Sequence, residues 1–438
     1  MWMAVGIVLF VLGLLFSIAW HELGHLTFAK LFDVRTTQYM IGFGKTLWSR
    51  QVGETEVGIK AVPLGGYIRM IGMVPPDARG RQRISTTALG PAGFFRQIIE
   101  DTRAGDRAQV AVTDDGRQFY QLHPAKRIVI MFAGPFMNLV LAVVLFAIVM
   151  MGIGVQTPNT TISEVQACVV PASAPAAEQG KTNCPQQQWT PARAIGLQSG
   201  DRVIAFGGTP ITGWDQLTAL IRAAAGTTVP ITVERAGRTV SRMVPIVRTD
   251  RPVYDNRGQR VGVTQTGFLG VGPQTPYVTQ GFGSAIERTG QFIGAAAHAV
   301  VAIPARIPAL WQAIFNGRER DVDSPVGVVG AGRISGEILA MDTEAKDKLA
   351  LFLTLLAGFN MSLFLLNLLP LLPLDGGHIF GAIIEWIRRG WARLTRRSVP
   401  PPFDVAKLMP VAYLVALLFI GLTALTFVAD VVNPVKLF

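Results

Sequence analysis

The sequence predicts a mainly α-helical membrane protein with four transmembrane helices, an extracytoplasmic β/α domain and a membrane-associated β-hairpin. Only 16% of the 438 residues are charged and 50% are hydrophobic, whereas soluble domains usually contain about 25% charged residues. This composition excludes an ordinary soluble enzyme and a disordered chain. Four stretches of at least 20 residues contain no Asp, Glu, Lys or Arg, namely 1–20, 128–163, 349–374 and 408–429.

The charge-free stretches match the length of membrane spans. A bilayer core about 30 Å thick requires roughly 20 apolar residues in a helix. Buried helices of a soluble protein are the alternative, but the second and fourth stretches are apolar on every side. We expect transmembrane helices at residues 1–29, 128–152, within 349–384 and within 408–438, the last followed by a short tail.

Basic residues are unevenly distributed between these spans. The 98 residues from 30 to 127 contain 15 Lys or Arg, and segment 154–348 contains 18 in 195 residues. Because basic loops remain in the cytoplasm, we expect segments 30–127 and 385–407 to be cytoplasmic and both termini to be extracytoplasmic. The net charge of +11 is then a topology signal, and no nucleic-acid-binding motif accompanies it.

The residues that carry chemistry begin in the first span. His21-Glu22-Leu23-Gly24-His25 is an H-E-x-x-H motif, in which two histidines four residues apart share one helix face and can ligate one Zn²⁺. Glu22 lies beside them, where it can act as general base toward a water that zinc makes acidic. Three ionisable residues in an otherwise charge-free span are costly and indicate function.

A catalytic zinc site takes three protein ligands and leaves one position open. Asp375 follows the charge-free run of the third span, and the topology places it on the cytoplasmic side, as it does His25. We predict Asp375 as the third ligand, with His378 as a rival for that position. Two prolines before Asp375 break the helix, and backbone groups freed at membrane depth require a protein-lined or wet cavity.

The segment between the second and third spans has its own organisation. Residues 153–192 are an expected linker that contains Cys168 and Cys184, for which we predict a disulfide, two free thiols being the alternative. Residues 193–273 contain a Gly-Leu-x-x-Gly-Asp turn, a helical segment and alternating strands, and they resemble a PDZ domain. PDZ domains bind extended peptides along a sheet edge. We expect residues 274–348 to form extracytoplasmic or interfacial helices.

Four features together resemble the bacterial site-2 proteases, in particular the type that regulates sigma E. They are the H-E-L-G-H motif, Phe132-Ala133-Gly134-Pro135-Phe136-Met137-Asn138, the PDZ-like segment and the N-L-L-P-x-x-P-L-D-G-G motif that ends at Gly377. The resemblance covers nearly the whole chain in the same order. It implies an intramembrane zinc metalloprotease of the bacterial plasma (inner) membrane, with its active site toward the cytoplasm.

The resemblance also implies roles for single residues. Asn367 contacts the substrate or stabilises the oxyanion, for which an amide donor is suited. Asn138 belongs to the same oxyanion and substrate group, with helix packing and an interhelical hydrogen bond as the alternative. A second amide that the family often carries five residues before Asn367 is replaced here by Ser362. The implied ligands of one zinc ion and the catalytic acid–base are His21, His25, Asp375 and Glu22.

Residues 54–72 alternate partly and break at Gly65-Gly66. In the family such a stretch is a hairpin that dips into the membrane and pairs with the substrate, and we expect Gly65, Gly66 and Tyr67 to do so. A peptide bond in a helix is shielded, so a substrate must unwind, and an edge strand can hold its extended form. An ordinary surface hairpin is the alternative.

The expected activity is site-2 cleavage of single-span membrane proteins in regulated intramembrane proteolysis. The resemblance implies that the substrate is an anti-sigma factor already clipped by an upstream site-1 protease, with remnant signal peptides as a second class. A non-catalytic PDZ scaffold that binds clipped membrane proteins and a zinc transporter are the rival functions. The intact zinc motif argues against the scaffold, and a single polar cluster among four spans argues against the transporter.

Overall fold

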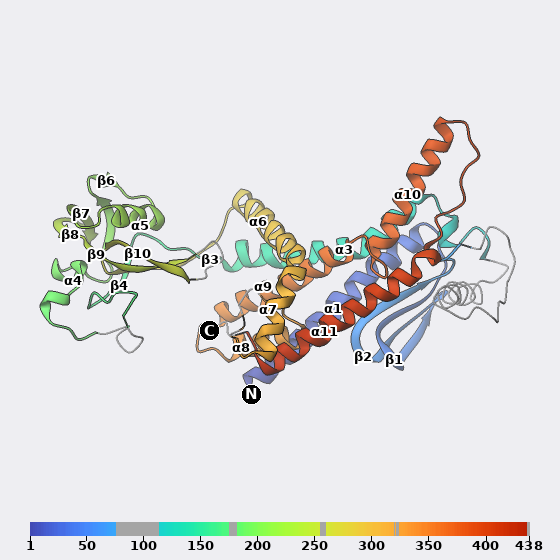
Figure 1. Ribbon diagram of the computed structural model, residues 1–438, viewed down its shortest axis with the longest axis horizontal. Helices are drawn as coiled ribbons and strands as arrows, with labels where there is room; N and C mark the ends of the chain where they lie inside the picture. Colours follow the sequence, from blue (N-terminus) through green and yellow to red (C-terminus); the bar gives the residue numbers. More distant parts are fainter. Residues whose placement is uncertain (76–113, 175–181, 255–259, 319, 321–323, 436–438) are drawn as a thin grey trace. The chain divides into compact units, whose positions relative to one another are not determined.

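The computed structural model of the chain describes residues 1–75, 114–174, 182–254, 260–318, 320 and 324–435 (Figure 1). It contains two compact units. The helical unit comprises Met1–Ile153 and Gly281–Phe438, and the second unit comprises Gly154–Gln280. Residues 76–113 of the expected cytoplasmic segment 30–127 lie outside the described residues.

Four helices among the described residues are long and apolar enough to cross a membrane, which confirms the expected number. They are α1 (Trp2–Leu31), α3 (Pro124–Ala147) with the π-helical turn η3 (Ile148–Ile153), α9 (Ala345–Asn367), and α11 (Met409–Val432) preceded by the 3-10 turn η6 (Val405–Leu408). Helices α6 (Phe282–Val301) and α7 (Ile303–Phe315) form a pair bent by 64°, which is a fifth candidate if the pair is one broken span. The helical unit also contains η2 (Phe119–Gln121), α8 (Val328–Ala340) and α10 (Asp375–Leu394).

Small residues allow α1 to approach its neighbours closely. A Cβ atom on Gly24 would lie 2.5 Å from the carbonyl oxygen of Ala133 in α3, and one on Gly6 would lie 2.5 Å from that of Ser335 in α8. The hydroxyl of Ser335 also donates a hydrogen bond to the carbonyl of Gly6 (2.8 Å). Lipid tails are as apolar as the helices, so close packing and interhelical hydrogen bonds drive helix association.

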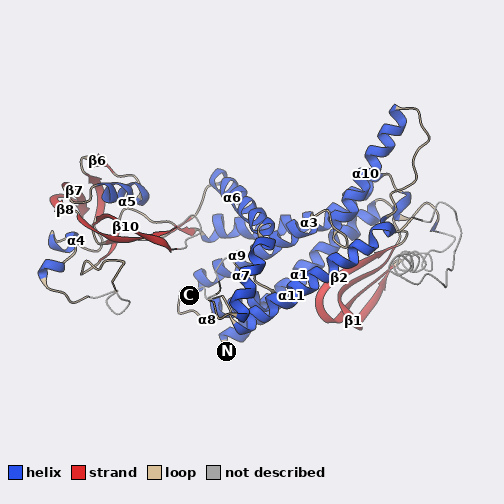
Figure 2. Ribbon diagram, in the orientation of Figure 1, coloured by secondary structure: helices blue, strands red, loops and turns tan. Residues whose placement is uncertain are grey.

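Strands β1 (Thr36–Val52) and β2 (Thr55–Met70) form a curled hairpin beside α1 that begins well before the expected stretch 54–72 (Figure 2). Met40 lies opposite both Gly58 and Tyr67, so the first part of β1 pairs with both ends of β2. Residues 66–70 thereby form a sheet edge that has no further strand partner among the described residues. The sequence pattern missed β1 because its residues 43–52 are all exposed, and alternation arises only where one face is buried.

The third span ends at Asn367, and α10 begins at Asp375. Pro370 and Pro373 lie between them and interrupt the helix because proline has no backbone N–H to donate. The first part of the expected basic segment 385–407 is helical, since α10 continues to Leu394. Apolar residues at helical spacing run through this basic stretch, whereas the sequence interpretation considered only its charge.

The second unit contains a four-stranded antiparallel sheet and three smaller strand pairs. The sheet has the order β6 (Thr209–Pro210), β5 (Arg202–Phe206), β7 (Thr228–Arg235) and β8 (Arg238–Pro245). The smaller pairs are β3 (Val155–Gln156) with β12 (Tyr277–Val278), β4 (Ile162–Val165) with β11 (Val271–Pro273), and β9 (Val247–Tyr254) with β10 (Arg260–Phe268). The helical elements are η5 (Gln186–Gln188), α4 (Pro191–Ala194) and α5 (Trp214–Ala223).

Part of the expected linker 153–192 belongs to the core of the second unit. Ile162 of β4 is fully buried and packs in one cluster with Leu217 of α5. A disulfide joins Cys168 to Cys184, whose Cα atoms are 6.1 Å apart. The sequence interpretation read this segment as a loop because it is rich in Pro, Ala and Gln, yet short strands inside it pair with strands more than 100 residues later.

The Gly-Asp turn of the second unit is held by a charged pair. Arg235 donates two hydrogen bonds to the buried carboxylate of Asp201, each 2.7 Å long. The amide of Gln198 donates a third. Burial opposes ionisation, but the guanidinium and this amide outweigh it and hold the pKa of Asp201 below its usual range.

A buried ion pair joins α11 to the segment that precedes α8 in the helical unit. Arg320 and Asp430 of α11 are each 1% exposed at the side chain, and their nearest atoms are 2.9 Å apart. The same carboxylate accepts hydrogen bonds from the backbone amides of Gly327 and Gly330 at the start of α8. Loss of one partner of a buried pair leaves an uncompensated charge, which is strongly destabilising.

We expect Asp430→Ala to lower the free energy of unfolding by about 3–5 kcal/mol, since Arg320 and two amides lose their acceptor. The matched control is Glu337→Ala, which removes a partly exposed partner of Arg333 within α8 and should cost less than about 1 kcal/mol. Thermal unfolding of the detergent-solubilised chain measures both. Equal shifts for the two variants would contradict the role assigned to Asp430.

Candidate metal centre

A cavity of about 420 Å³ in the helical unit brings together the residues predicted for the site. Helix α1, helix α3, the hairpin, the end of α9 and the start of α10 all contribute to its wall. The first and last lining residues, Ile18 and His378, are 360 positions apart in sequence. The predicted residues that line it are His21, Glu22, His25, Gly65, Gly66, Tyr67, Asn138, Asn367, Asp375 and His378.

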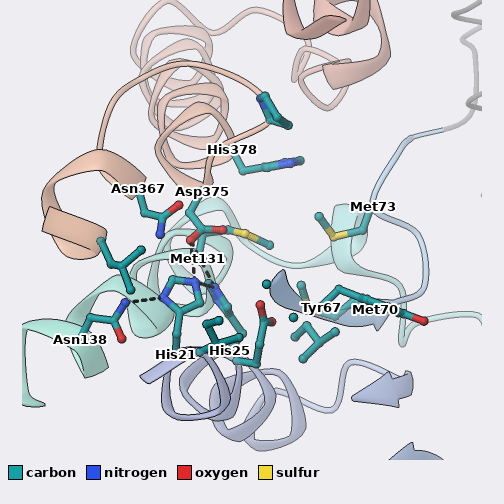
Figure 3. Close-up of a pocket in the computed structure, with 17 residues that line it drawn as sticks. His21, His25, Tyr67, Met70, Met73, Met131, Asn138, Asn367, Asp375 and His378 are labelled. Atoms are coloured by element: carbon teal, nitrogen blue, oxygen red, sulfur yellow. Dashed lines mark hydrogen bonds and ion pairs between the residues drawn. The ribbon is translucent and has the colours of Figure 1, made fainter. Parts of the chain in front are cut away.

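Three side chains converge on one point of this cavity (Figure 3). The Nε2 atoms of His21 and His25 are 3.2 Å apart, and each lies 3.3 Å from Oδ2 of Asp375. The two histidines are one helical turn apart in α1, so their rings emerge on the same face. Asp375 is the first residue of α10, where the positive end of the helix dipole favours a carboxylate.

The other ring nitrogen of each histidine is engaged away from this point. Nδ1 of His25 lies 2.8 Å from the carbonyl oxygen of Ile130 in α3, to which only a protonated nitrogen can donate. Nδ1 of His21 lies 3.2 Å from Nδ2 of Asn138, the donor atom of that amide. Rotation of the amide by 180° exchanges its N and O atoms and brings Oδ1, which is buried without a hydrogen-bond partner among the described residues, to Nδ1 as an acceptor. In that orientation both Nδ1 atoms carry the proton and both Nε2 atoms are free to ligate a metal.

The donor set fits zinc. Two imidazole nitrogens and one carboxylate oxygen supply the three protein ligands of a catalytic site and leave one position open. Oδ2 of Asp375 is buried and makes no hydrogen bond with any described residue, which a bound cation would remedy. His378 lines the cavity but lies outside the group of three ligand atoms, which are all within 4.8 Å of one another. The geometry therefore favours Asp375 over His378.

The carboxylate of Glu22 lies between this group and the edge of the hairpin. It interacts with the backbone amide of Ile68 in the edge segment 66–70. A Cβ atom on Gly66 would lie 3.1 Å from Cγ of Glu22 and 2.8 Å from Cγ2 of Ile18. Only glycine allows the edge strand to pass this close to α1.

The amide side chains of the third span occupy two different places. Asn367 lines the cavity and points toward the ligand group (Figure 3). Asn360 is fully buried and donates hydrogen bonds to Ser17 Oγ in α1 and to the carbonyl of Leu356. Ser362 donates to the carbonyl of Gly358. Asn360 and Ser362 therefore join helices or bond within one, and Asn367 is the amide of α9 that faces the site.

The sequence interpretation missed the apolar wall of the cavity. Met70, Met73 and Met131 line it together with Ile18 and Leu363. Methionine is flexible and adapts to apolar groups of different shape. Met70 ends β2 and Met131 lies seven residues before Asn138, but such positions are identified only once the helices are placed, because apolar residues are common throughout the spans.

A smaller hollow of about 230 Å³ occurs in the second unit. Trp214, Thr218 and Ile221 of α5 form one side, and residues 266–273 around β11 contribute to the other. Gly270 adopts a φ of +88° between them, a left-handed conformation that favours glycine. One edge of β11 pairs with β4, so an extended peptide could be accommodated only along the side that faces α5.

The chain matches peptidase family M50 over residues 9–400. It is 36% identical to the zinc metalloprotease Rip1 of Mycobacterium bovis over 444 residues, which cover 99% of this chain and 98% of that protein. It is 33% identical to Rip1 of Mycolicibacterium smegmatis over 449 residues and the full length of both chains. The metalloprotease MmpA of Caulobacter vibrioides is 27% identical over 390 residues, with coverage of 85% and 83%.

We expect Gly134→Ala to abolish metal binding, because its Cβ would lie 2.1 Å from Nε2 of His25. Metal analysis of the purified chain should give about one zinc for the wild type and less than about a tenth of that for the variant. Gly152→Ala is the control, since its Cβ would meet only Ile148, at 4.0 Å. Full zinc content in Gly134→Ala would show that His25 does not need this packing.

Proposed function

Because the chain belongs to peptidase family M50, the site-2 proteases, we propose that Glu22 is its catalytic acid–base and that residues 66–70 hold its substrate. The chain is a zinc metalloendopeptidase that cleaves membrane proteins within the membrane. One observation carries the proposal. His21, His25 and Asp375 converge in a cavity that also contains the Glu22 carboxylate and the hairpin edge.

The proposed reaction is hydrolysis of one peptide bond. Zinc, when bound, supplies Lewis acidity and an acidified water at neutral pH. The Glu22 carboxylate takes one proton from the attacking water, and the remaining hydroxyl adds to the carbonyl carbon. Glu22 then donates the proton to the amide nitrogen as the C–N bond breaks. Asn367 is positioned to donate an N–H to the developing oxyanion.

Asn138 has a different proposed role from Asn367. Its contact with Nδ1 of His21 supports an orienting role, in which it holds the ring with Nε2 toward the metal. Partners of this kind typically change metal affinity by about 10- to 100-fold. Asn138 is therefore assigned to the ligand rather than to the substrate, in agreement with the interhelical hydrogen bond weighed as an alternative.

The edge segment 66–70 is the proposed substrate-binding strand. A transmembrane helix shields its peptide bonds by internal hydrogen bonds, so cleavage requires a locally extended chain. An extended segment can add to a free sheet edge through backbone hydrogen bonds. Because the amide of Ile68 reaches Glu22, a chain paired with this edge lies next to the catalytic group. Leu47 and Trp48 of β1 are 68% and 56% exposed, which supports contact of the hairpin with lipid.

The substrate class we propose is a single-span membrane protein that has already been shortened, such as a clipped anti-sigma factor or a remnant signal peptide. The hollow between α5 and β11 supports a PDZ-like role of the second unit, which would screen substrates after an upstream site-1 protease has acted. The basic residues of segments 30–127 and 385–407 support a cytoplasmic location for both. Both termini and the second unit are then extracytoplasmic, where the Cys168–Cys184 disulfide is stable.

A non-catalytic scaffold does not account for the site. A scaffold needs neither three metal ligands nor an acid–base, yet all four side chains line one cavity. The zinc transporter is also disfavoured, because its path requires polar residues along several spans. The described residues contain a single cluster of metal-ligating side chains at membrane depth.

We expect Glu22→Gln to reduce cleavage of a pre-clipped single-span substrate by at least about 100-fold, since the amide cannot accept the proton. The zinc content should be unchanged, because Glu22 is not one of the three convergent ligands. The assay uses the full chain and the substrate reconstituted in one vesicle. Undiminished cleavage would refute the assignment of Glu22.

We expect Gly66→Ala to reduce cleavage on the order of 10- to 100-fold with normal zinc content, since a shift of about 1 Å between strand and catalytic group has effects of this size. Gly290→Ala in α6 is the control, because its Cβ would meet nothing within 4 Å. If the two variants cleave at the same rate, the edge strand does not position the substrate.

A further inference from the structure

Helix α10 exposes an apolar stripe along its length. Its members recur at intervals of three or four residues, which places them on one face of a helix. Ile387, Trp391 and Leu394 are 66%, 63% and 78% exposed. Figure 1 shows the C-terminal part of α10 extending beyond the other helices of the helical unit. The stripe consists of Phe380, Ile383, Ile387, Trp391 and Leu394.

Arginines border this stripe and continue past the end of α10. At about 100° per residue, Arg388 and Arg393 fall on opposite sides of the stripe. Arg396 and Arg397 lie two and three residues after the last helical residue, Leu394. All four side chains are exposed, and the described residues offer them no ion-pair partner, whereas Arg389 pairs with Glu385. We call Arg388, Arg393, Arg396 and Arg397 the terminal arginines.

The opposite face of α10 is fixed by buried contacts. Glu385 is fully buried and lies 2.5 Å from a guanidinium nitrogen of Arg127 at the start of α3. It also accepts a hydrogen bond from the backbone amide of Phe403 (2.7 Å). Gly381 packs against the ring of Phe403. These contacts set the rotation of α10 about its axis, so the apolar stripe is held facing away from α3.

We propose that α10 is an interfacial helix that binds anionic phospholipid, with its apolar stripe among the acyl chains and the terminal arginines on the headgroup phosphates. Apolar faces bordered by Lys or Arg are typical of helices that lie at a membrane surface. Each basic residue near an anionic surface strengthens binding by roughly fivefold. Trp391 suits the same depth, since its ring is apolar and its N–H polar.

The position of α10 in the chain supports a lipid as the occupant. The membrane-crossing segment Val405–Val432 begins 11 residues after α10 ends, so the terminal arginines cannot lie far from a membrane surface. A protein partner would have to match both the apolar stripe and the four positive charges. An anionic leaflet offers acyl chains to the stripe and negative headgroups to the arginines at every point of its surface. Because α10 begins at Asp375, lipid bound near its far end restrains the helix that supplies this ligand candidate.

The test compares backbone hydrogen exchange of residues 380–397 in the full chain, reconstituted in nanodiscs of phosphatidylcholine alone or with 30% phosphatidylglycerol. We expect exchange to slow by at least about tenfold in the anionic discs. The difference should disappear in 1 M salt, where the Debye length is about 3 Å. This arm uses the unaltered chain and therefore does not depend on the folding of any variant.

Two matched variants locate the effect. The test variant carries Arg388→Gln, Arg393→Gln, Arg396→Gln and Arg397→Gln and should lose the lipid difference. The control carries Arg222→Gln, Arg238→Gln, Arg242→Gln and Arg248→Gln, four exposed arginines of the second unit, and should keep it. Equal exchange of residues 380–397 in the two lipids overturns the proposal. Fast exchange in both would show that nothing covers the stripe, and slow exchange in both would indicate a protein segment or a second copy on it. Zinc content and cleavage in detergent are measured separately, so a failure of the lipid arm leaves the proposed function untouched.

Discussion

The backbone contact between α1 and α3 determines where the proposed metal ligands of α1 lie. Gly24 of α1 rests on the carbonyl of Ala133, and Gly134 leaves room for the ring of His25. At this distance α3 supplies a hydrogen-bonding group to Nδ1 of each histidine, the carbonyl of Ile130 to His25 and the side-chain amide of Asn138 to His21. Any larger side chain at this contact would separate the helices and release both rings, which explains why the site depends on two residues without side chains.

The membrane imposes a second constraint on the same site. Irregular backbone at membrane depth must be buried in protein or border a wet cavity, because lipid offers no hydrogen bonds. Two such segments occur side by side at the cavity, the break before Asp375 and the sheet edge at residues 66–70. The break allows the chain to turn so that Asp375 faces the histidines, and the sheet edge can pair with an unwound substrate.

Features that depend on residues close together in the chain could be predicted from the sequence, and features that depend on distant residues could not. The membrane helices and the H-E-x-x-H pair depend on neighbours within a few residues, and the spans appear in the structure where the composition predicts them. The sequence interpretation missed strand β1 and the full length of helix α10. Strand β1 is largely exposed, so its residues do not alternate, and arginines lie between the apolar residues of α10. Strands inside the segment 153–192 were missed because their partners lie more than 100 residues away.

The sequence by itself determined the class of protein, its charge-free spans and the chemical nature of the ligands, since residue type and helical spacing are local properties. Only the tertiary structure brought Asp375, and not His378, into one group with the two histidines. It also placed the side chain of Asn138 against Nδ1 of His21 and the amide of Ile68 beside Glu22. These outcomes depend on distances between segments far apart in the chain, which close helix packing sets and no local pattern encodes.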